Sequence, residues 1–283
     1  MSIEVTHETA KNQYVEANGT RYAYRRFGAK GGIPLVFCHR FRATIDEWDP
    51  EVVNAFAKER EVILFNSAGV GSSSGEIPTD IPAMADHAIA FITALGLPLV
   101  DLLGFSMGGY VATTVTLNAP KLVRKLILAG TGPGGGEGIL PGEPEVRPVS
   151  GRPVLGLEEY LFLFFAPSES SQQAGQAYWE RLKRRPGESE PALSPQAVER
   201  QVAAVTSWSK GVNSAFPRLG EIDHEVLITN GHRDIMVPTL NSFTMSQRVR
   251  RAQLIIYPDS GHGFLFQYPK LFTTHALEFL RAR

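Results

Sequence analysis

Ser106 lies in a short pattern that is typical of a nucleophilic serine. Residues 104–108 read Gly-Phe-Ser-Met-Gly, between an expected strand at 102–105 and an expected helix at 108–117. A turn this sharp strains the serine backbone, and the two glycines let strand and helix approach each other. The hydroxyl then stands at a helix N-terminus, which favours developing negative charge. The pattern alone would also fit a glycine-rich turn, but its position between strand and helix predicts a nucleophile.

A serine hydroxyl attacks efficiently only when a positioned base takes its proton, so a histidine is needed. The chain has seven histidines. His262 follows the last expected strand, in a loop at the sheet edge where such folds place their sites. His232 competes with it because it also lies near a strand end. His87 and His275 fall inside expected helices, where solvent or core roles suit them better. We therefore predict His262 as the base.

Two aspartates are candidates for orienting His262. Asp259 lies three residues before it, whereas Asp234 follows a different expected strand. Residues on one short loop hold each other poorly, while an acid from a separate strand end fixes the imidazole against the sheet. We therefore predict Asp234 as the orienting acid and expect Asp259 to bond nearby backbone amides in its loop.

Short apolar segments alternate with helical segments along most of the chain. Asn18-Gly19 predicts a tight turn in a hairpin over residues 12–27. Strands are then expected at 34–38, 61–65, 102–105, 125–129, 225–229 and 253–257, and helices at 46–59, 81–95, 108–117, 239–249 and 269–282. This alternation predicts an α/β fold with a mostly parallel sheet flanked by helices on both faces.

The alternation breaks after the glycine-rich run at 130–136. Three expected helices follow it without a convincing strand, at 157–166, 172–185 and 195–209. We therefore expect a core of residues 1–136 and 222–283 and a helical cap insertion at 137–221. The apolar run at 160–165 predicts a helix that is hydrophobic all round and lies between two layers.

Composition excludes several classes of function. The 283 residues carry a net charge of −1, so no overall field favours nucleic acid or an anionic membrane. Cys38 is the only cysteine, and the first residues lack a secretory signal, so we expect a cytoplasmic protein. The run at 130–136 fits a dinucleotide pattern only superficially, and no metal-ligand spacing occurs. We expect no cofactor, no metal and a small-molecule substrate that is partly apolar, while the oligomeric state is not indicated.

These residues resemble the α/β-hydrolase fold superfamily, in which nucleophile, acid and base follow one another in this chain order. Residues 231–238 look like its acid turn, G-x-x-D-x-x-x-P. Residues 106–109 and the insertion look most like the branch of cofactor-free haloperoxidases, carbon–carbon bond hydrolases and small-molecule esterases. The likeness spans nearly the whole chain. A serine nucleophile argues against the dehalogenase and epoxide hydrolase branches, which attack with a carboxylate.

The resemblance implies an oxyanion hole made of two backbone N–H groups. One belongs to Met107, directly after the nucleophile. The other belongs to Phe41, because residues 39–41 with Trp48 downstream look like the superfamily's H-G-x loop and its following tryptophan.

The sequence departs from the superfamily pattern at three positions near the site. Arg40 replaces the usual glycine, Arg42 stands where proline is common, and Asn66 stands where aspartate is usual. Asn66 is expected to lie in a structural turn. Arg40 and Arg42 are substrate-pocket candidates that would favour a carboxylate-bearing substrate, although solvent-facing arginines are common.

Four aromatic residues of the insertion are candidates for an apolar pocket lining. They are Phe162, Phe164, Phe165 and Trp179. The alternative is that these side chains only hold the insertion to the core.

The function expected from these residues is hydrolysis of a carboxylic ester or lactone of a small molecule through an acyl-enzyme on Ser106. Two other reactions stay open, namely cofactor-free perhydrolysis of the haloperoxidase type and hydrolysis of a carbon–carbon bond. A receptor or scaffold that keeps the hydrolase fold is the alternative outside enzymes.

Overall fold

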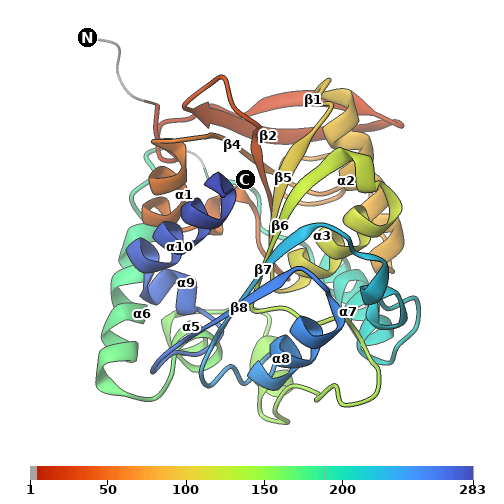
Figure 1. Ribbon diagram of the computed structural model, residues 1–283. Coiled ribbons are helices and arrows are strands. Elements are labelled where there is room, and N and C mark those ends of the chain that lie inside the picture. The colour runs from red at the N-terminus through yellow and green to blue at the C-terminus, as the bar shows by residue number, and fades with distance from the viewer. Residues whose placement is uncertain (1–4, 188, 283) are drawn as a thin grey trace.

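A single twisted sheet forms the centre of the computed structural model, which describes residues 5–187 and 189–282. Within these residues the sheet has eight strands in the order β1-β2-β4-β3-β5-β6-β7-β8 (Figure 1). The strands are β1 Gln13–Ala17, β2 Thr20–Gly28, β3 Leu35–Cys38, β4 Glu61–Phe65, β5 Val100–Phe105, β6 Val123–Ala129, β7 Glu225–Gly231 and β8 Ala252–Tyr257. β1 and β2 form an antiparallel hairpin, β2 is antiparallel to β4, and all other pairs are parallel. The α/β fold class and the hairpin are confirmed.

Helices cover both faces of the sheet. One face carries α1 Pro50–Ala57, α9 Phe264–Gln267 and α10 Pro269–Arg281, and the other carries α2 Ile81–Ala94, α3 Met107–Asn118 and α8 Thr239–Arg248. Short 3-10 helices lie at η1 Ile45–Glu47, η2 Pro120–Leu122 and η3 Phe216–Glu221. None of the helices in the described part of the chain is long and apolar enough to cross a membrane.

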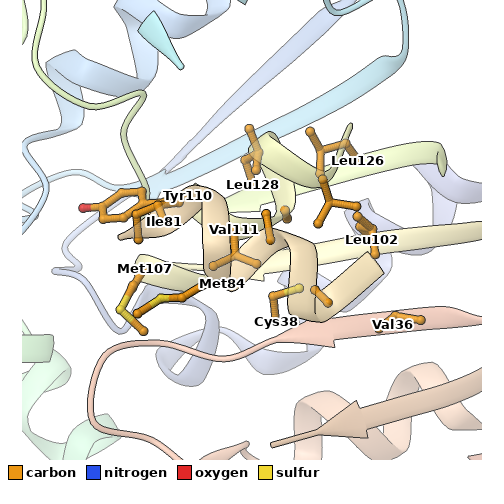
Figure 2. Close-up of a cluster of buried hydrophobic side chains, with 14 of the residues drawn as sticks. Val36, Cys38, Ile81, Met84, Leu102, Met107, Tyr110, Val111, Leu126 and Leu128 are labelled. Carbon is orange, nitrogen blue, oxygen red and sulfur yellow. The ribbon is translucent and has the colours of Figure 1, made fainter. Parts of the chain in front are cut away.

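Two apolar cores form because the central strands are buried on both faces. All six residues of β5 are buried. Figure 2 shows one core, in which Met107 of α3 lies near Met84 of α2, and Val111 of α3 belongs to the same cluster as Leu102 of β5. This packing fixes α3 on the sheet, directly after the turn that carries Ser106.

The expected helix at 46–59 is divided in the structure. The 3-10 helix η1 comes first, and α1 begins only at Pro50. Asp49 causes the division, because its side chain accepts a hydrogen bond from the backbone N–H of Glu51 at 3.0 Å and caps the new helix. The sequence also did not predict α9 or α4 Val146–Ser150, which are too short to show a helical period.

The segment between β6 and β7 contains the three helices that were expected there. They are α5 Leu157–Phe164, α6 Glu169–Leu182 and α7 Pro195–Ser209, in addition to α4. The expectation that residues 160–165 are enclosed on all sides is wrong at Phe162, which is 41% exposed. The helix buries Tyr160, Leu163 and Phe164 and turns Phe162 outward, because its apolar run is wider than the face that contacts the protein. The predicted division at 137–221 stays a prediction, and residues 1–4, 188 and 283 of the predicted ranges lie outside the described residues.

The close approach of α3 to β3 leads to a prediction about stability. A Cβ atom at position 108 would lie 2.0 Å from the carbonyl oxygen of Cys38, so Gly108→Ala must push the helix away from the strand. We expect this variant to lower the free energy of unfolding by about 3 kcal/mol. Gly220→Ala is the control, because a Cβ there would meet nothing within 4 Å. Urea unfolding measures both, and equal stability of the two variants would contradict the prediction.

Candidate active site

Ser106 sits on a strained turn between β5 and α3. Its φ is 55° and its ψ is −123°, a conformation that costs a non-glycine residue about 1–3 kcal/mol. The turn is held by two hydrogen bonds, from the N–H of Ser106 to the carbonyl of Ala129 at 2.9 Å and from the Thr131 hydroxyl to the carbonyl of Ser106 at 2.7 Å. The serine hydroxyl makes no capping hydrogen bond to α3. It is therefore available for chemistry at a helix N-terminus.

Glycines allow this turn to form. A Cβ at Gly104 would lie 2.4 Å from the carbonyl oxygen of Gly108, and one at Gly108 would lie 2.7 Å from that of His39. Only residues without a side chain let the start of α3 come this close to β3 and β5. The backbone after Ser106 and the loop after β3 are thereby brought together at one sheet edge.

His262 and Asp234 meet although they are 28 positions apart. His262 Nδ1 lies 2.7 Å from Asp234 Oδ2, and both side chains are fully buried. Asp234 Oδ1 accepts hydrogen bonds from the N–H groups of Met236 and Val237, at 2.8 Å each. An ionised carboxylate only accepts, so Nδ1 carries the proton and Nε2 has a free lone pair. Among the described residues Nε2 has no hydrogen-bond partner. This is the tautomer that a general base requires.

The alternative acid, Asp259, and the alternative base, His232, do not take part in this pair. Asp259 accepts hydrogen bonds from the hydroxyls of Ser168 and Ser170, at 2.8 and 2.5 Å, so it holds the start of α6 and does not orient His262. His232 is exposed. Of the two acids considered, the structure pairs Asp234 with His262.

Aromatic rings and a glycine enclose His262. The ring centroids of Phe105 and Phe164 lie 4.9 and 5.5 Å from that of His262. A Cβ at Gly130 would lie 3.2 Å from His262 Nδ1, so the end of β6 also adjoins the imidazole. The backbone N–H of Ser106 donates to the carbonyl of Ala129, directly before Gly130, so Ser106 and His262 both adjoin the end of β6.

His39 orients the peptide that carries the N–H of Phe41. The backbone N–H of Ser67 points to His39 Nε2 at 3.4 Å, so Nε2 accepts and Nδ1 carries the proton. Nδ1 then donates to the carbonyl of Arg40 at 3.1 Å, which belongs to the same peptide as the N–H of Phe41. Burial, the largest cause, together with the charge of Arg40 lowers the pKa of His39 to about 4, against the raising effect of its backbone hydrogen bond. His39 is therefore neutral near pH 7.

The two arginines of this loop behave differently. Arg40 is 4% exposed, and its guanidinium donates to the carbonyl of Phe41 at 3.0 Å and to the hydroxyl of Tyr160 at 2.7 Å. The guanidinium of Arg42 instead donates to the carbonyls of Ser150, Arg152 and Pro153, at the end of α4 and just after it. Arg42 was expected to be a pocket candidate, and these contacts hold its guanidinium on the inserted segment.

The four aromatic pocket candidates are distributed over different surroundings. Phe164 packs on His262, and Trp179 packs edge-on against Tyr160 with ring centroids 5.0 Å apart. Phe162 and Phe165 line a groove of about 570 Å³ on the outside of α5, together with Arg233, Ile235 and Gly261. Of the four, only Phe164 has its ring against His262.

A second groove adjoins the acid turn. Its volume is about 450 Å³, and its lining includes Tyr110 of α3, Trp208 of α7 and Met236, two positions after Asp234. Burial, the largest cause, and the charge of Asp234 raise the pKa of Tyr110. Neither groove is lined by Ser106, which is 7% exposed. No three metal-ligating side chains gather among the described residues.

Two contacts at the site were not predicted from the sequence. Tyr160 contacts Arg40 across 120 positions, and Glu190 accepts a hydrogen bond from the Asn66 side-chain amide at 2.9 Å across 124 positions. Asn66 also accepts from the backbone N–H of Ile45 at 2.9 Å, so it has the structural role expected of it. No local pattern links residues this far apart, and a buried glutamate in a loop carries no sequence signal.

Comparisons with known proteins agree with this architecture. A sequence model of the family described as alpha/beta hydrolase fold matches residues 33–269. The solved structure of an alpha/beta hydrolase fold protein from Chitinophaga pinensis has a TM-score of 0.91 and 37% sequence identity, and the match covers 99% of this chain and 100% of that one.

Two curated relatives are named as hydrolases. A putative carbamate hydrolase of Agrobacterium fabrum is 27% identical over 240 residues, which cover 82% of this chain and 87% of that protein. A 2-hydroxymuconate semialdehyde hydrolase of a Pseudomonas species is 27% identical over 266 residues, which cover 88% of this chain and 87% of that protein.

The pairing of His262 with Asp234 predicts unequal effects of two conservative variants. Asp234→Asn keeps the shape but removes the charge that fixes the His262 tautomer, so we expect the labelling rate of Ser106 by a fluorophosphonate to fall about 10⁴-fold. Asp259→Asn is the matched control and should slow labelling less than about tenfold, because it disturbs only the start of α6. The reverse ranking would refute this assignment of the acid.

The lowered pKa of His39 predicts a loss of stability in acid. The unfolded state binds the proton near the ordinary pKa of 6.5 and the folded state only near pH 4, so the contribution of His39 is complete above 6.5 and is lost as the pH falls toward 4. The expected loss is about 3 kcal/mol. In His39→Gln the free energy of unfolding, measured in urea, should fall less between pH 8 and pH 4 than it does in the wild type. The difference between the two proteins at about pH 8 gives the cost of the substitution that does not depend on pH, and it is subtracted at every other pH. If the free energy of unfolding depends on pH equally in the variant and the wild type, His39 is not buried in its neutral form.

Proposed function

The chain belongs to the alpha/beta hydrolase fold family and is a hydrolase, and we propose that it cleaves a carboxylic ester or lactone of a small molecule through an acyl-enzyme on Ser106. The observation that carries this proposal is the combination of a strained serine with an uncommitted hydroxyl and a histidine whose Nδ1 lies 2.7 Å from Asp234. The free Nε2 of that histidine supplies the base.

Acylation begins when the Ser106 hydroxyl attacks the acyl carbon and His262 Nε2 takes its proton. Asp234 stabilises the imidazolium through the hydrogen bond between Nδ1 and Oδ2, and two backbone N–H groups bound to Oδ1 hold the carboxylate in place. His262 then returns the proton to the leaving oxygen, and the acyl-enzyme forms. A water molecule that gives its proton to the same histidine releases the acid and regenerates Ser106.

The N–H groups of Met107 and Phe41 are the proposed oxyanion donors. Met107 is the first residue of α3, so its N–H has no partner within the helix and adds to the positive end of the helix dipole. The Phe41 peptide is held from its other side, since the Arg40 carbonyl accepts the His39 hydrogen bond. A donor that is already oriented needs no rearrangement in the transition state, and one such donor contributes about 3 kcal/mol.

The inserted segment 137–221 is proposed as a cap over this site. The carbonyl of Phe164 accepts a hydrogen bond from the N–H of Gly263 at 2.6 Å, and Gln201 of α7 accepts from the N–H of Arg42 at 2.9 Å. The insertion thus contacts both the base loop and the oxyanion loop. A cap in this position excludes water and strengthens electrostatic stabilisation at the reacting atoms. It also provides apolar side chains for a partly apolar substrate.

Hydrolysis of a carbon–carbon bond is the second candidate. It is favoured by the similarity to the Pseudomonas 2-hydroxymuconate semialdehyde hydrolase over 88% of this chain. Perhydrolysis would need the same acyl-enzyme with peroxide in place of water. The sequence-based expectation of a cytoplasmic location stays a prediction.

Replacement of the nucleophile tests the proposed function. The assay uses a para-nitrophenyl ester or a lactone that the wild type hydrolyses. Ser106→Ala should lower its turnover by about three to six orders of magnitude while the protein stays folded, because no other group forms the acyl-enzyme. A fluorophosphonate should label Ser106 in the wild type only, as read by peptide mass spectrometry. Two parallel assays test the alternative reactions. Cleavage of a dienoate ketone would indicate hydrolysis of a carbon–carbon bond, and peroxide-dependent bromination would indicate perhydrolysis. Persistent labelling of the variant, or labelling at another serine, would overturn the assignment.

A further inference from the structure

Arg40 is a buried cation without a carboxylate partner. Its side chain is 4% exposed, and no acidic oxygen of the described residues lies within ion-pair distance of it. The other deeply buried arginines are paired, Arg25 with Asp46 at 2.6 Å and Arg181 with Asp49 at 2.6 Å. A buried charge is costly unless a counter-charge accompanies it. Arg40, the buried arginine without such a partner, stands at the position where the superfamily pattern has glycine.

The partners of the guanidinium are neutral. It donates to the carbonyl of Phe41 and the hydroxyl of Tyr160, and its central carbon lies 5.2 and 4.9 Å from the ring centroids of Tyr160 and Phe164. A guanidinium has five N–H groups, and Nε has no partner among the described residues. The hydroxyl of Tyr160 accepts from Arg40 while its own proton is free to be donated. Several donors therefore converge at one place.

Glu47 acts on the charge of Arg40 but does not form an ion pair with it. Its Oε2 accepts hydrogen bonds from the backbone N–H of Thr44 at 2.6 Å and from the Thr44 hydroxyl at 2.7 Å. Burial raises the pKa of Glu47, against the lowering effect of Arg40 and of its bonds to Thr44. The electrostatic requirement of Arg40 is therefore only partly met within the protein.

Arg40 also lies beside the proposed reacting centre. Phe41, to which it donates, carries a proposed oxyanion donor, and Phe164, on which it stacks, packs against His262. An anion bound by Arg40 would thus be held next to the acyl group under attack. The guanidinium of Arg42, two positions along the chain, instead donates to three carbonyl oxygens of the insertion.

We propose that Arg40 and the hydroxyl of Tyr160 bind a carboxylate of the substrate, so that the enzyme prefers esters or lactones of an acid bearing a second, anionic group. This inference rests on the proposed function and specifies its substrate class. The planar guanidinium supplies paired donors to the two carboxylate oxygens, and the phenol adds a third. Because α5 covers the guanidinium, binding of the anion requires Tyr160 and Phe164 to move aside.

The test compares substrates that differ only in charge. Para-nitrophenyl pentanoate and mono-para-nitrophenyl glutarate place a methyl group or a carboxylate on the acyl chain, and phenyl and carboxyphenyl pentanoate do so on the leaving group. We expect the wild type to show no preference in the leaving-group pair but to prefer the anionic member of the acyl-chain pair. In Arg40→Met the ratio of kcat/KM for that pair should fall about 30-fold or more, since charged hydrogen bonds are lost. Tyr160→Phe should lower the ratio less, and Arg40→Lys should restore part of it.

Arg42→Met is the matched control, because it removes an arginine of the same loop and should change both members of each pair equally. The ratio of kcat/KM separates recognition of the substrate carboxylate from structural support of the oxyanion loop. Loss of that support would lower kcat/KM for the anionic and the neutral substrate by the same factor. Unchanged ratios in Arg40→Met, or a wild type without any anionic preference, would overturn the proposal. If Arg40→Met fails to fold, Arg40→Lys and Tyr160→Phe decide the question by the same ratios.

A binding measurement on an inactive variant tests the carboxylate site separately from ester hydrolysis. Calorimetric titration of folded Ser106→Ala with glutarate should show binding that weakens about 30-fold or more when Arg40→Met is added. Equal glutarate binding with and without Arg40 would overturn the carboxylate site even if ester hydrolysis is found. Conversely, a wild type that hydrolyses no ester but binds glutarate through Arg40 would overturn ester hydrolysis and leave the carboxylate site supported.

Discussion

The close contact between the start of α3 and the ends of β3 and β5 is the constraint on which the site depends. A Cβ at Gly108 would lie 2.0 Å from the Cys38 carbonyl oxygen, so no side chain fits there. This contact forces Ser106 to a φ of 55° and sets the helix N-terminus beside the loop that carries Phe41. Packing of α3 into the apolar core offsets the strain, which costs about 1–3 kcal/mol. The position of Ser106 thus follows from the sheet and helix that support it.

Local sequence patterns predict the parts of this protein that are decided locally. The strands, the long helices and the turn at Ser106 depend on periodicity and on glycine spacing within about ten residues, so they could be predicted. The pairing of Asp234 with His262 could also be predicted, because parallel strands deliver their C-terminal loops to one edge. Short elements such as α4 and α9 have no period to detect, and the division of the helix at 46–59 depends on the single cap at Asp49.

The environment of Arg40 could not be predicted because it is made by residues far away in the chain. The sequence showed an arginine in place of a glycine and left both Arg40 and Arg42 as candidates. Their separation arises from the insertion, which offers a hydroxyl and two rings to Arg40 and three carbonyl oxygens to Arg42. Such contacts depend on how the helices of the insertion pack, and amphipathic patterns do not specify that packing.

The packing of the insertion can be followed from one buried ion pair to the catalytic histidine proposed here. Arg181 near the end of α6 pairs with Asp49 and donates to the carbonyl of Phe266, which ties α6 to the core. Gly175 then lets α5 approach α6, since a Cβ there would lie 2.5 Å from Leu161. With α6 fixed and α5 seated on it, Phe164 reaches His262 and Tyr160 reaches Arg40. Loss of one partner in a buried ion pair costs about 3–5 kcal/mol, so this distant pair stabilises the position of α6, on which the contacts of Phe164 with His262 and of Tyr160 with Arg40 depend.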